Sequence, residues 1–561
     1  MKEESSSKEI KKITPENRRT MYYEYVFYSS IAIISCLYCT IKLAKISYDF
    51  SKKTFDISEN SFIKPDNIFG GSHDFNDSQW RGFRSNIFII FIFAAVFITI
   101  STLLKRLTNL ITLKIFYLIA GIGFNLFLHR IGSLIMFIFI TVFYLFSLLY
   151  HLIGRKAYIT ITWVYCIGLK MISEKKSGFI PIIKEWNIFG EMFFDISLDW
   201  HSAFGLLFLR LISFNIEYAN AIDGNTKSNN IKDIEQISAH CDKCKQGKFC
   251  LTALKFTYVD IKDFNFLNLL IYIYYPPLYM AGPTMLFNSF MFQVNTGKNN
   301  HHNDFLHKDK IIYFFRVLLT MTIMELFNHF IYTDAIIAYA FDRFRQENSY
   351  FYYYFLAQNS LMFTFLKYAV MWKFARLWSW FNGILTEENI NRCIYNNYSF
   401  EGFWRAWHRS FNIWLIRYMY IPLGGKDKKF LNTFVVFSFV ALWHDLSFHL
   451  LYWAWIIYIT LIPEIIVKTI FNKPKMQYLN NYMWFRYLKM LSCCIIVLLM
   501  ITANLIGFES NMGKIKDTLG GLWEDLSFSN FVLLLLFYFP YPFFMFFIRE
   551  VEEMNGIKKN F

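Results

Sequence analysis

Residues 401–455 hold two polar clusters inside sequence that is otherwise typical of a membrane interior. The first cluster is residues 404–412, WRAWHRSFN, with His408 near its centre. The second is Trp443, His444 and Asp445, at the end of an apolar run. An ionisable side chain at membrane depth is costly unless it faces a cavity or a partner, so such residues are functional candidates. We therefore predict a catalytic core in residues 401–455.

His444 is the strongest candidate for proton transfer. A neutral imidazole can take a proton from an alcohol and return it near pH 7, which is the task of a general base. Asp445 or a backbone carbonyl could fix its tautomer. The alternative is a hydrogen-bonded structural histidine at a helix end.

His408 and Asn412 are four residues apart, so on a continuous helix they would share one face. Arg405, Arg409 and Arg417 lie nearby and could bind phosphate or carboxylate groups. The alternative is an amphipathic interfacial helix with a belt of Trp404, Trp407 and Trp414. Pro422 to Gly425 then break the helix, which would let the chain fold back and bring His408 to His444.

No protein nucleophile is evident. The chain has no G-x-S-x-G elbow, and no cysteine is paired with a nearby histidine inside the apolar core. A histidine without a protein nucleophile indicates direct attack of an acceptor hydroxyl on an activated carbonyl.

A hydrophilic loop, residues 219–262, carries four possible metal ligands. They are His240, Cys241, Cys244 and Cys250. Their number suits a structural zinc site, but the spacing is compressed and no second C-x2-C follows. A disulfide with a spare thiol, if the loop is lumenal, is the alternative.

The composition predicts an all-α polytopic transmembrane protein. Of 561 residues, 55% are hydrophobic and only 18% are charged, and apolar runs recur from end to end. About eleven hydrophobic segments are expected by hydropathy, some of them re-entrant. Residues 264–290 are broken by Pro276-Pro277 and Gly282-Pro283, and such breaks survive in lipid only beside protein or a cavity.

The predicted organisation follows from charge. The net charge of +15 suits cytosolic loops and anionic headgroups, and the scattered basic residues argue against nucleic-acid binding. We expect a disordered cytosolic tail at 1–20, one membrane domain at 21–548 with a first lumenal loop at 44–85, and a cytosolic tail at 549–561. The first span is expected near Tyr23–Leu43.

Residues 401–425 together with Trp443-His444-Asp445 resemble the membrane-bound O-acyltransferase (MBOAT) family. The match is closest to its glycerol uptake protein branch, also called the GPI-anchor remodelling branch, which is related to hedgehog acyltransferase. Supporting stretches are residues 74–84 (DFNDSQWRGFR), 211–218 (LISFNIEY) and 275–283 (YPPLYMAGP).

The resemblance implies the MBOAT fold, with an intramembrane pocket open to both sides. Acyl-CoA, the expected co-substrate, would enter from the cytosol and a lipid or protein acceptor from the lumen. His444 would be the catalytic histidine and His408 the second functional residue. Cys393 stands at the offset of a haem-bearing cysteine in hedgehog acyltransferase. The residues expected to bind acyl-CoA and substrate are Trp404, Arg405, Trp407, Arg409, Asn412, Arg417, Trp443 and Asp445.

The resemblance therefore implies an enzyme that moves a long-chain acyl group from acyl-CoA to a hydroxyl. By the same resemblance the favoured acceptor is a lyso-GPI lipid, with a GPI-anchored protein as the other expected partner. Lys558-Lys559 resemble a dilysine retrieval signal and predict the endoplasmic reticulum membrane. Two alternatives stay open: a glycerol or polyol transporter, and a catalytically silent relative that regulates another acyltransferase.

Overall fold

Helices make up nearly all of the computed structural model of the protein. It describes residues 15–55, 63–65, 72–175, 200–224, 250–257, 259–296, 307–508, 520–522 and 524–556. The amino-terminal elements are α1 (Pro15–Thr54), β1 (Ile63–Pro65), β2 (Ser72–Asp74), α2 (Ser78–Ser85), α3 (Ile87–Leu107), α4 (Leu110–His129), α5 (Gly132–Ser147), α6 (Tyr150–Lys175) and α8 (Trp200–Ile222). The central elements are α11 (Leu251–Leu254), α12 (Phe266–Tyr274), α13 (Pro276–Tyr279), α14 (Phe287–Thr296), α15 (His307–Phe330), α16 (Thr333–Tyr339), α17 (Phe341–Glu347) and α18 (Tyr350–Phe381). The carboxy-terminal elements are α19 (Phe400–Ala406), α20 (Arg409–Leu415), a π-helix (Ile416–Tyr420), α21 (Lys429–His444), α22 (Phe448–Phe471), α23 (Met483–Phe508), α25 (Phe528–Tyr538) and α26 (Pro540–Met554).

Seven stretches of the described chain are long and apolar enough to cross a membrane. They are α1, α3, α4, α15, α22, α23 and the α25–α26 stretch. An eighth candidate is the pair α5 and α6, which bends by 119° at its break. The prediction of a polytopic helical membrane protein is confirmed. The shorter hydrophobic segments of the sequence include buried, broken helices such as α12, α13 and α14.

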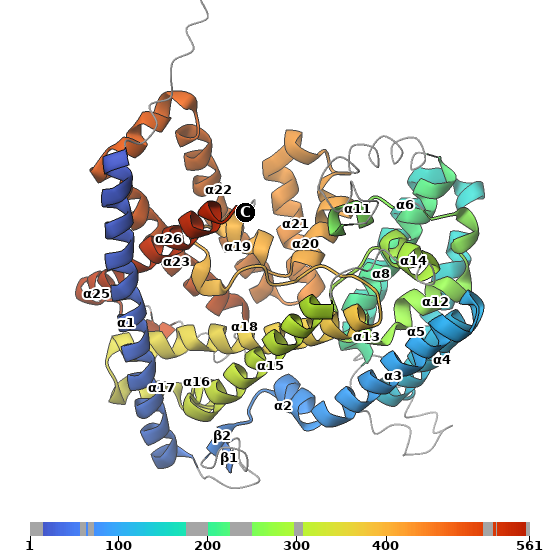
Figure 1. Cartoon of the computed structure of the whole chain (residues 1–561), viewed down its shortest axis with the longest axis horizontal. Helices are drawn as coiled ribbons and strands as arrows, with labels where there is room; N and C mark the ends of the chain where they lie inside the picture. The colour runs from blue at the N-terminus through green and yellow to red at the C-terminus, as the bar shows by residue number, and fades with distance from the viewer. Residues whose placement is uncertain are drawn as a thin grey trace, which may run out of the picture.

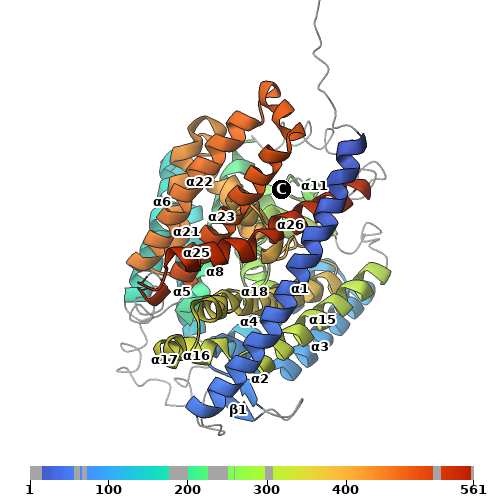
Figure 2. The ribbon, with the colours of Figure 1, turned by 90° about the vertical axis from the view of Figure 1, so that its left-hand side faces the viewer.

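The elements lie in two groups joined by long crossing helices (Figure 1). Helix α1 runs along one side, next to α26 and the other carboxy-terminal helices, and α3 to α6 form the opposite side. Helices α15 and α18 pack on each other and cross between the two groups. In the side view α1 crosses the front of the molecule (Figure 2). Its last residues lie beside β1, at the opposite end from its first residues.

Helix α1 corrects two predicted boundaries. It begins at Pro15 and ends at Thr54, so the last residues of the predicted disordered tail and the first of the predicted lumenal loop are helical. The helix outlasts its apolar run because one face stays packed: Ser47, Phe50 and Ser51 are buried. The Ser47 hydroxyl also accepts a hydrogen bond from the backbone N–H of Tyr332 at 2.9 Å.

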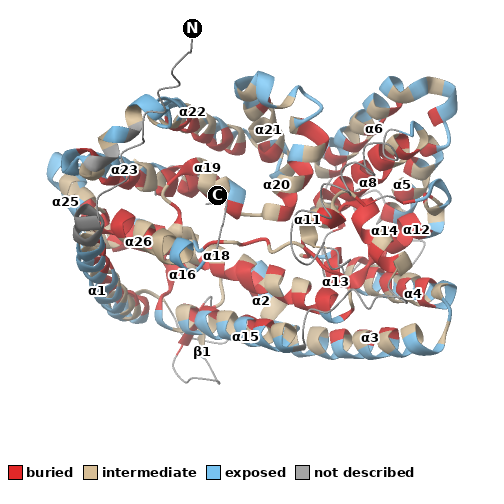
Figure 3. Ribbon diagram, turned by 45° about the horizontal axis from the view of Figure 1, so that its top comes forward, coloured by how far each residue is buried: buried red, intermediate tan, exposed pale blue. Residues whose placement is uncertain are grey.

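Burial is concentrated around α8, α12, α13 and α14, whereas α1, α3 and α15 expose one long face (Figure 3). Isoleucine, leucine and phenylalanine side chains dominate those exposed faces, as expected where helices meet lipid. Among these buried elements, α8 contacts Trp414 of α20 and Trp443 of α21, which are discussed below.

The predicted break at Pro276-Pro277 is confirmed, and Arg210 of α8 compensates for it. Helix α12 ends at Tyr274 and the short α13 begins at Pro276. In a continuous helix the carbonyls of Tyr272 and Ile273 would accept from residues 276 and 277, but proline has no N–H. The buried Arg210 guanidinium donates to both carbonyls instead, at 3.1 and 2.5 Å, and also to that of Leu278.

Candidate active site

His408 and His444 line one cavity of about 720 Å³. Its wall is assembled from distant parts of the chain: the β2–α2 corner, α16, α18, the link after α13, the α19–α20 junction, the end of α21, and facing residues of α22 and α23. The sequence prediction that the two histidines meet in one cavity is therefore realised in the structure.

His408 sits at a sharp break rather than inside a helix. Its backbone is left-handed, with φ 45° and ψ 46°, and it is the N-cap of α20. This conformation is uncommon for a residue with a side chain. Asn389 holds the turn, because its carbonyl accepts from Arg409 N at 3.1 Å and its side-chain oxygen from Ser410 N at 3.1 Å. The imidazole packs on Trp372, with ring centroids 4.6 Å apart.

The predicted shared helical face of His408 and Asn412 is wrong. The backbone bond from Asn412 N to His408 O is present at 3.0 Å. However, α19 ends before His408, and the Asn412 side chain donates to the Trp404 carbonyl at 3.2 Å. Asn412 therefore ties α20 to α19, and it is not among the residues that line the cavity.

His444 is the last residue of α21, and Trp443 connects it to His408. The Trp443 ring centroid lies 4.7 Å from that of His444 and 6.1 Å from that of His408. The Trp443 indole N–H donates to the Gly205 carbonyl at 2.8 Å, which fixes the ring against α8. The His444 ring also lies 6.2 Å from that of Trp453. His444 is surface-accessible because it faces the open cavity, not because it lies on the outside of the fold.

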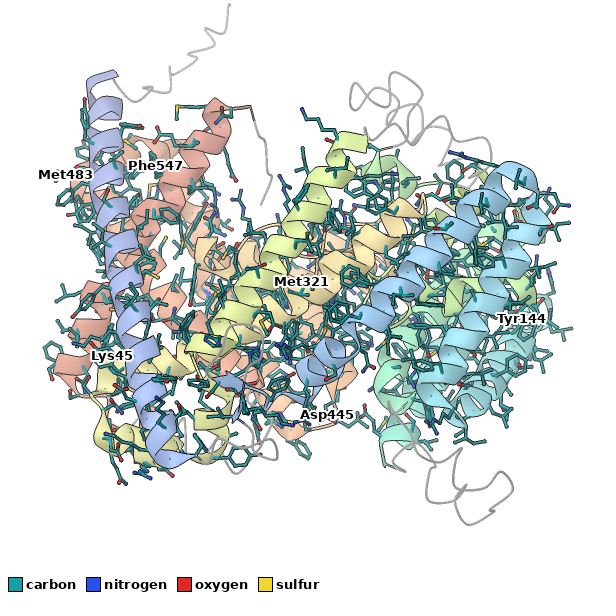
Figure 4. All side chains as sticks on the ribbon, turned by 60° about the horizontal axis from the view of Figure 1, so that its bottom comes forward. Lys45, Tyr144, Met321, Asp445, Met483 and Phe547 are labelled. Carbon is teal, nitrogen blue, oxygen red and sulfur yellow. The ribbon has the colours of Figure 1, made fainter. Side chains whose placement is uncertain are left out.

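Asp445 does not take the orienting role predicted for it. It follows α21 in an extended conformation, and its N–H donates to the Ala441 carbonyl at 3.2 Å. Among the described residues it makes no hydrogen bond to His444, and it does not line the cavity. Figure 4 labels Asp445 at the lower edge of the fold, on an exposed part of the chain.

The three predicted anion-binding arginines are each paired with a glutamate. Arg405 contacts Glu401 at 2.5 Å, Arg409 contacts Glu387 at 3.3 Å, and Arg417 contacts Glu217 at 2.7 Å. None of the three lines the cavity with the histidines. Arg417 donates additionally to the Lys255 carbonyl at 3.1 Å, so it joins the π-helix to the rest of the fold.

The predicted tryptophans divide into two roles. Trp407 and Trp443 line the cavity. Trp404 packs behind it, with its ring 5.6 Å from Trp453 and 5.7 Å from Phe437. Trp414 is fully buried and donates to the Leu209 carbonyl at 2.9 Å, so it is a core residue and not part of an interfacial belt.

Sequence reasoning missed the polar network that docks the α20 region onto α8. The Glu217 carboxylate accepts from the Tyr418 hydroxyl at 2.7 Å, and that hydroxyl lies 2.9 Å from Ser213 Oγ. The Ser213 hydroxyl accepts from Phe287 N at 3.0 Å, at the start of α14. The signal was present, since Glu217 is an acid in an apolar stretch.

Sequence reasoning also missed Lys367 of α18, which lies on the cavity wall. The buried Lys367 ammonium lies 2.6 Å from an Asp77 carboxylate oxygen. The neighbouring Asp74 accepts from the backbone of Asn76 and Ala335, both at 3.0 Å. Burial raises the pKa of the Asp74 carboxyl to about 6.

The structure describes only part of the residues predicted to bind zinc or haem. His240, Cys241 and Cys244 lie outside the described residues, whereas the Cys250 sulfur accepts from Ala253 N at 3.4 Å. No group of three potential ligands occurs within the described ranges. Cys393 is a free, exposed thiol outside the wall of the main cavity.

This arrangement suits proton transfer to and from a bound hydroxyl, and comparison with known proteins identifies the family. The family model described as MBOAT, membrane-bound O-acyltransferase family, matches residues 188–503, more than half of the chain. The chain belongs to the membrane-bound O-acyltransferase family. The matched range contains both cavity histidines, the broken α12–α13 segment and Arg210.

The similarity to individual acyltransferases extends beyond that range. Membrane-bound O-acyltransferase gup1 of Schizosaccharomyces pombe is 31% identical over 99% of this chain and 93% of its own. Membrane-bound O-acyltransferase GUP1 of Candida tropicalis is 31% identical over 87% of this chain and 81% of its own. Protein-cysteine N-palmitoyltransferase HHAT of Mus musculus is 29% identical over 37% of this chain and 41% of its own. The chain is a multi-pass membrane protein of an acyltransferase family.

Proposed function

We propose that this acyltransferase moves a long-chain acyl group from acyl-CoA to the hydroxyl of a lyso-GPI lipid, with His444 as general base. The observation that carries the proposal is the shared cavity of His408 and His444. The likeness to the gup1 and GUP1 acyltransferases along most of the chain supports the reaction type. The acceptor class follows from the resemblance to the GPI-anchor remodelling branch.

In the proposed reaction, His444 takes the proton of the acceptor hydroxyl as the oxygen attacks the thioester carbonyl. The new C–O bond forms, the C–S bond breaks, and the imidazolium of His444 returns the proton to the departing thiolate. Holding the two substrates in one cavity makes the attack effectively unimolecular.

His408 is proposed to pair with the substrate. Its imidazole lines the cavity and lies 6.1 Å from the Trp443 ring, between centroids. A ring nitrogen would donate to the thioester oxygen or accept from the acceptor hydroxyl. The positive φ of His408 supports this role, since backbone strain gathers at functional sites.

A smaller apolar cavity of about 70 Å³ adjoins the main one and suits a short part of an acyl chain, whereas the length of that chain is inferred from the resemblance. It shares Leu361, Thr364 and Trp407 with the main cavity. The rest of its wall comes mainly from α23, α25 and α26 and the segment before α19. It would receive part of the hydrocarbon chain while the thioester stays near the histidines.

The cellular site is proposed to be the endoplasmic reticulum membrane. This rests on Lys558-Lys559, which lie outside the described residues.

The test is an acyl-transfer assay with purified protein, labelled long-chain acyl-CoA, and lyso-GPI or lysophosphatidylinositol. We expect His444→Ala to lower kcat by about 10²–10⁴-fold, the usual contribution of a general base. His151→Ala is the matched control, because His151 is exposed on α6 and its loss should leave the rate unchanged. Equal transfer by wild type and His444→Ala would reject the general base. Polyol flux into liposomes without any acyl transfer would favour a transporter.

A further inference from the structure

One end of the main cavity is polar and open, far along the chain from either histidine. Six polar side chains line it, and we call this set the polar rim: Asn76, Asp77, Ser78, Gln79, Asp334 and Lys367. Ser78 and Gln79 are exposed, whereas Lys367 is buried. The rim therefore runs from the outside of the protein into the cavity wall, and the proton-transfer step proposed above uses none of it.

Internal bonds hold the rim in place. The Asn76 amide donates to the backbone carbonyl of Asp334 at 3.2 Å. One oxygen of Asp77 caps α2 by accepting from Trp80 N at 2.6 Å, and the other contacts Lys367 at 2.6 Å. Three separate segments are thus fixed against one another, as a preformed binding site requires.

The charge of the rim disfavours a bare phosphate. Among the described residues that line the cavity, two carboxylates, Asp77 and Asp334, accompany one ammonium, that of Lys367. This ammonium is already compensated: it contacts Asp77 and lies 5.3 Å from the Tyr368 ring centroid and 5.6 Å from that of Phe363. A phosphate at the rim would lie beside two carboxylates and an ammonium that already has a carboxylate partner, and like charges repel.

The same groups suit a ligand with several hydroxyls. Carboxylates accept hydrogen bonds from hydroxyls, whereas the amides of Asn76 and Gln79 and the ammonium of Lys367 donate to them. Tyr368 and Trp372 line the cavity next to the rim and offer ring surfaces for the carbon face of a sugar or cyclitol. Trp372 also packs on His408, so it connects the rim to the catalytic histidines.

We infer that the polar rim binds a hydroxyl-rich headgroup, of sugar or polyol type, on the acceptor lipid. The inference rests on the proposed function, in which a lipid hydroxyl is acylated. The headgroup bound at the rim leaves the reacting hydroxyl deeper in the cavity, near His408 and His444. The rim residues select the acceptor and take no part in the proton transfer.

The experiment compares three lysolipids with the same acyl chain: lysophosphatidylinositol, lysophosphatidic acid and lysophosphatidylethanolamine. Binding to the purified protein in nanodiscs is measured first, and acyl transfer to each lipid in parallel. The test variant is Asp334→Asn combined with Gln79→Ala, which leaves the Asp77–Lys367 ion pair in place. Asp342→Asn is the matched control, since Asp342 is an exposed acid on the next helix, α17.

Wild type should bind lysophosphatidylinositol at least about tenfold more tightly than the other two lipids, the worth of one or two good hydrogen bonds. The double variant should stay folded, as thermal unfolding checks, and should lose that preference, whereas Asp342→Asn should keep it. Wild type that prefers the phosphate or amine headgroup, or a double variant that keeps the inositol preference, overturns the inference. Inositol preference without acyl transfer to any lipid would support the rim and reject the proposed function, so the two failures are distinguishable.

Discussion

Arg210 offers the sharpest test of how the fold supports the cavity. Replacing Arg210 with methionine keeps a long apolar stem but removes every donor. The carbonyls of Tyr272, Ile273 and Leu278 then lose their partner. Each unsatisfied buried carbonyl costs about 1–3 kcal/mol, which gives about 3–9 kcal/mol for the three.

One effect of Arg210→Met is stabilising. The buried guanidinium costs several kcal/mol of desolvation in the wild type, and the variant no longer carries that cost. The carbonyls outnumber the charge and cannot reach water at the buried break, so we expect a net loss of about 3 kcal/mol in unfolding free energy. Arg210→Lys should lose less, because its ammonium keeps the charge and can still reach some of the carbonyls.

The assay is thermal unfolding of the purified protein in detergent, with acyl transfer per folded molecule as a second readout. Arg155→Met is the control, because Arg155 forms a partly exposed pair with Asp223 and surface pairs contribute little. The link after α13 forms part of the cavity wall, so Arg210→Met should also lower the rate per folded molecule. A melting temperature of Arg210→Met equal to that of wild type would refute the argument that arginine replaces the missing proline N–H groups.

Three further predictions concern the surroundings of the site. In Gly507→Ala the new Cβ would lie 2.5 Å from the Trp453 ring, so the displaced indole should reduce both activity and stability, the latter by about 1–3 kcal/mol. In Glu464→Leu the N–H of Phe400, which donates to Glu464 at 2.7 Å, loses its acceptor. We expect the unfolding free energy to fall by about 2 kcal/mol and α19 to become more mobile. Faster proteolysis near that helix would show the second effect. The folded-state pKa of Asp74, about 6, lies above its ordinary value of 3.8. The carboxyl therefore stabilises the fold fully below pH 4, and this stabilisation, at most about 3 kcal/mol, is lost as the pH rises through 6. Asp74→Asn should flatten that part of the plot of melting temperature against pH.

Each of these three predictions has a control that separates the stated cause from a general loss of stability. Gly168→Ala is the control for Gly507, because an added Cβ at Gly168 meets nothing within 4 Å. Glu464→Gln keeps an acceptor for α19 and should retain more stability than Glu464→Leu; equal losses would contradict the capping role. For Asp74, an unchanged pH profile in Asp74→Asn would show that another group titrates.

The sequence predicted the membrane class, the family resemblance and the two histidines, because these depend on local composition and residue type. Apolar runs report the spans, and a polar residue in such a run stands out against its neighbours. The break at Pro276-Pro277 was equally visible, since proline removes an N–H wherever it stands. What each of these features contacts depends on the fold.

Pairing between segments explains most of the differences between the expected site and the observed contacts. Arg405, Arg409 and Arg417 look like an anion-binding group in sequence, but a glutamate neutralises each of them. Two of those glutamates, Glu387 and Glu217, come from other segments of the chain, so no local sequence pattern could predict these ion pairs. The helical face expected for His408 and Asn412 failed for a related reason, because the backbone bends at His408 where Asn389 captures the next two N–H groups.

The geometry around the two cavity histidines therefore depends on hydrogen bonds between separate segments rather than on any one helix. Trp443 is fixed to α8 through the Gly205 carbonyl, and α20 is fixed through Ser410, whose hydroxyl accepts from Thr284 N at 2.8 Å. Helix α8 also carries Arg210, which stabilises the break that leads to Thr284. Both histidines thus take their positions from α8 and its neighbours. Because the two cavity histidines lie at the ends of separate helices, only such cross-links can hold them at a fixed separation, as a shared active site requires.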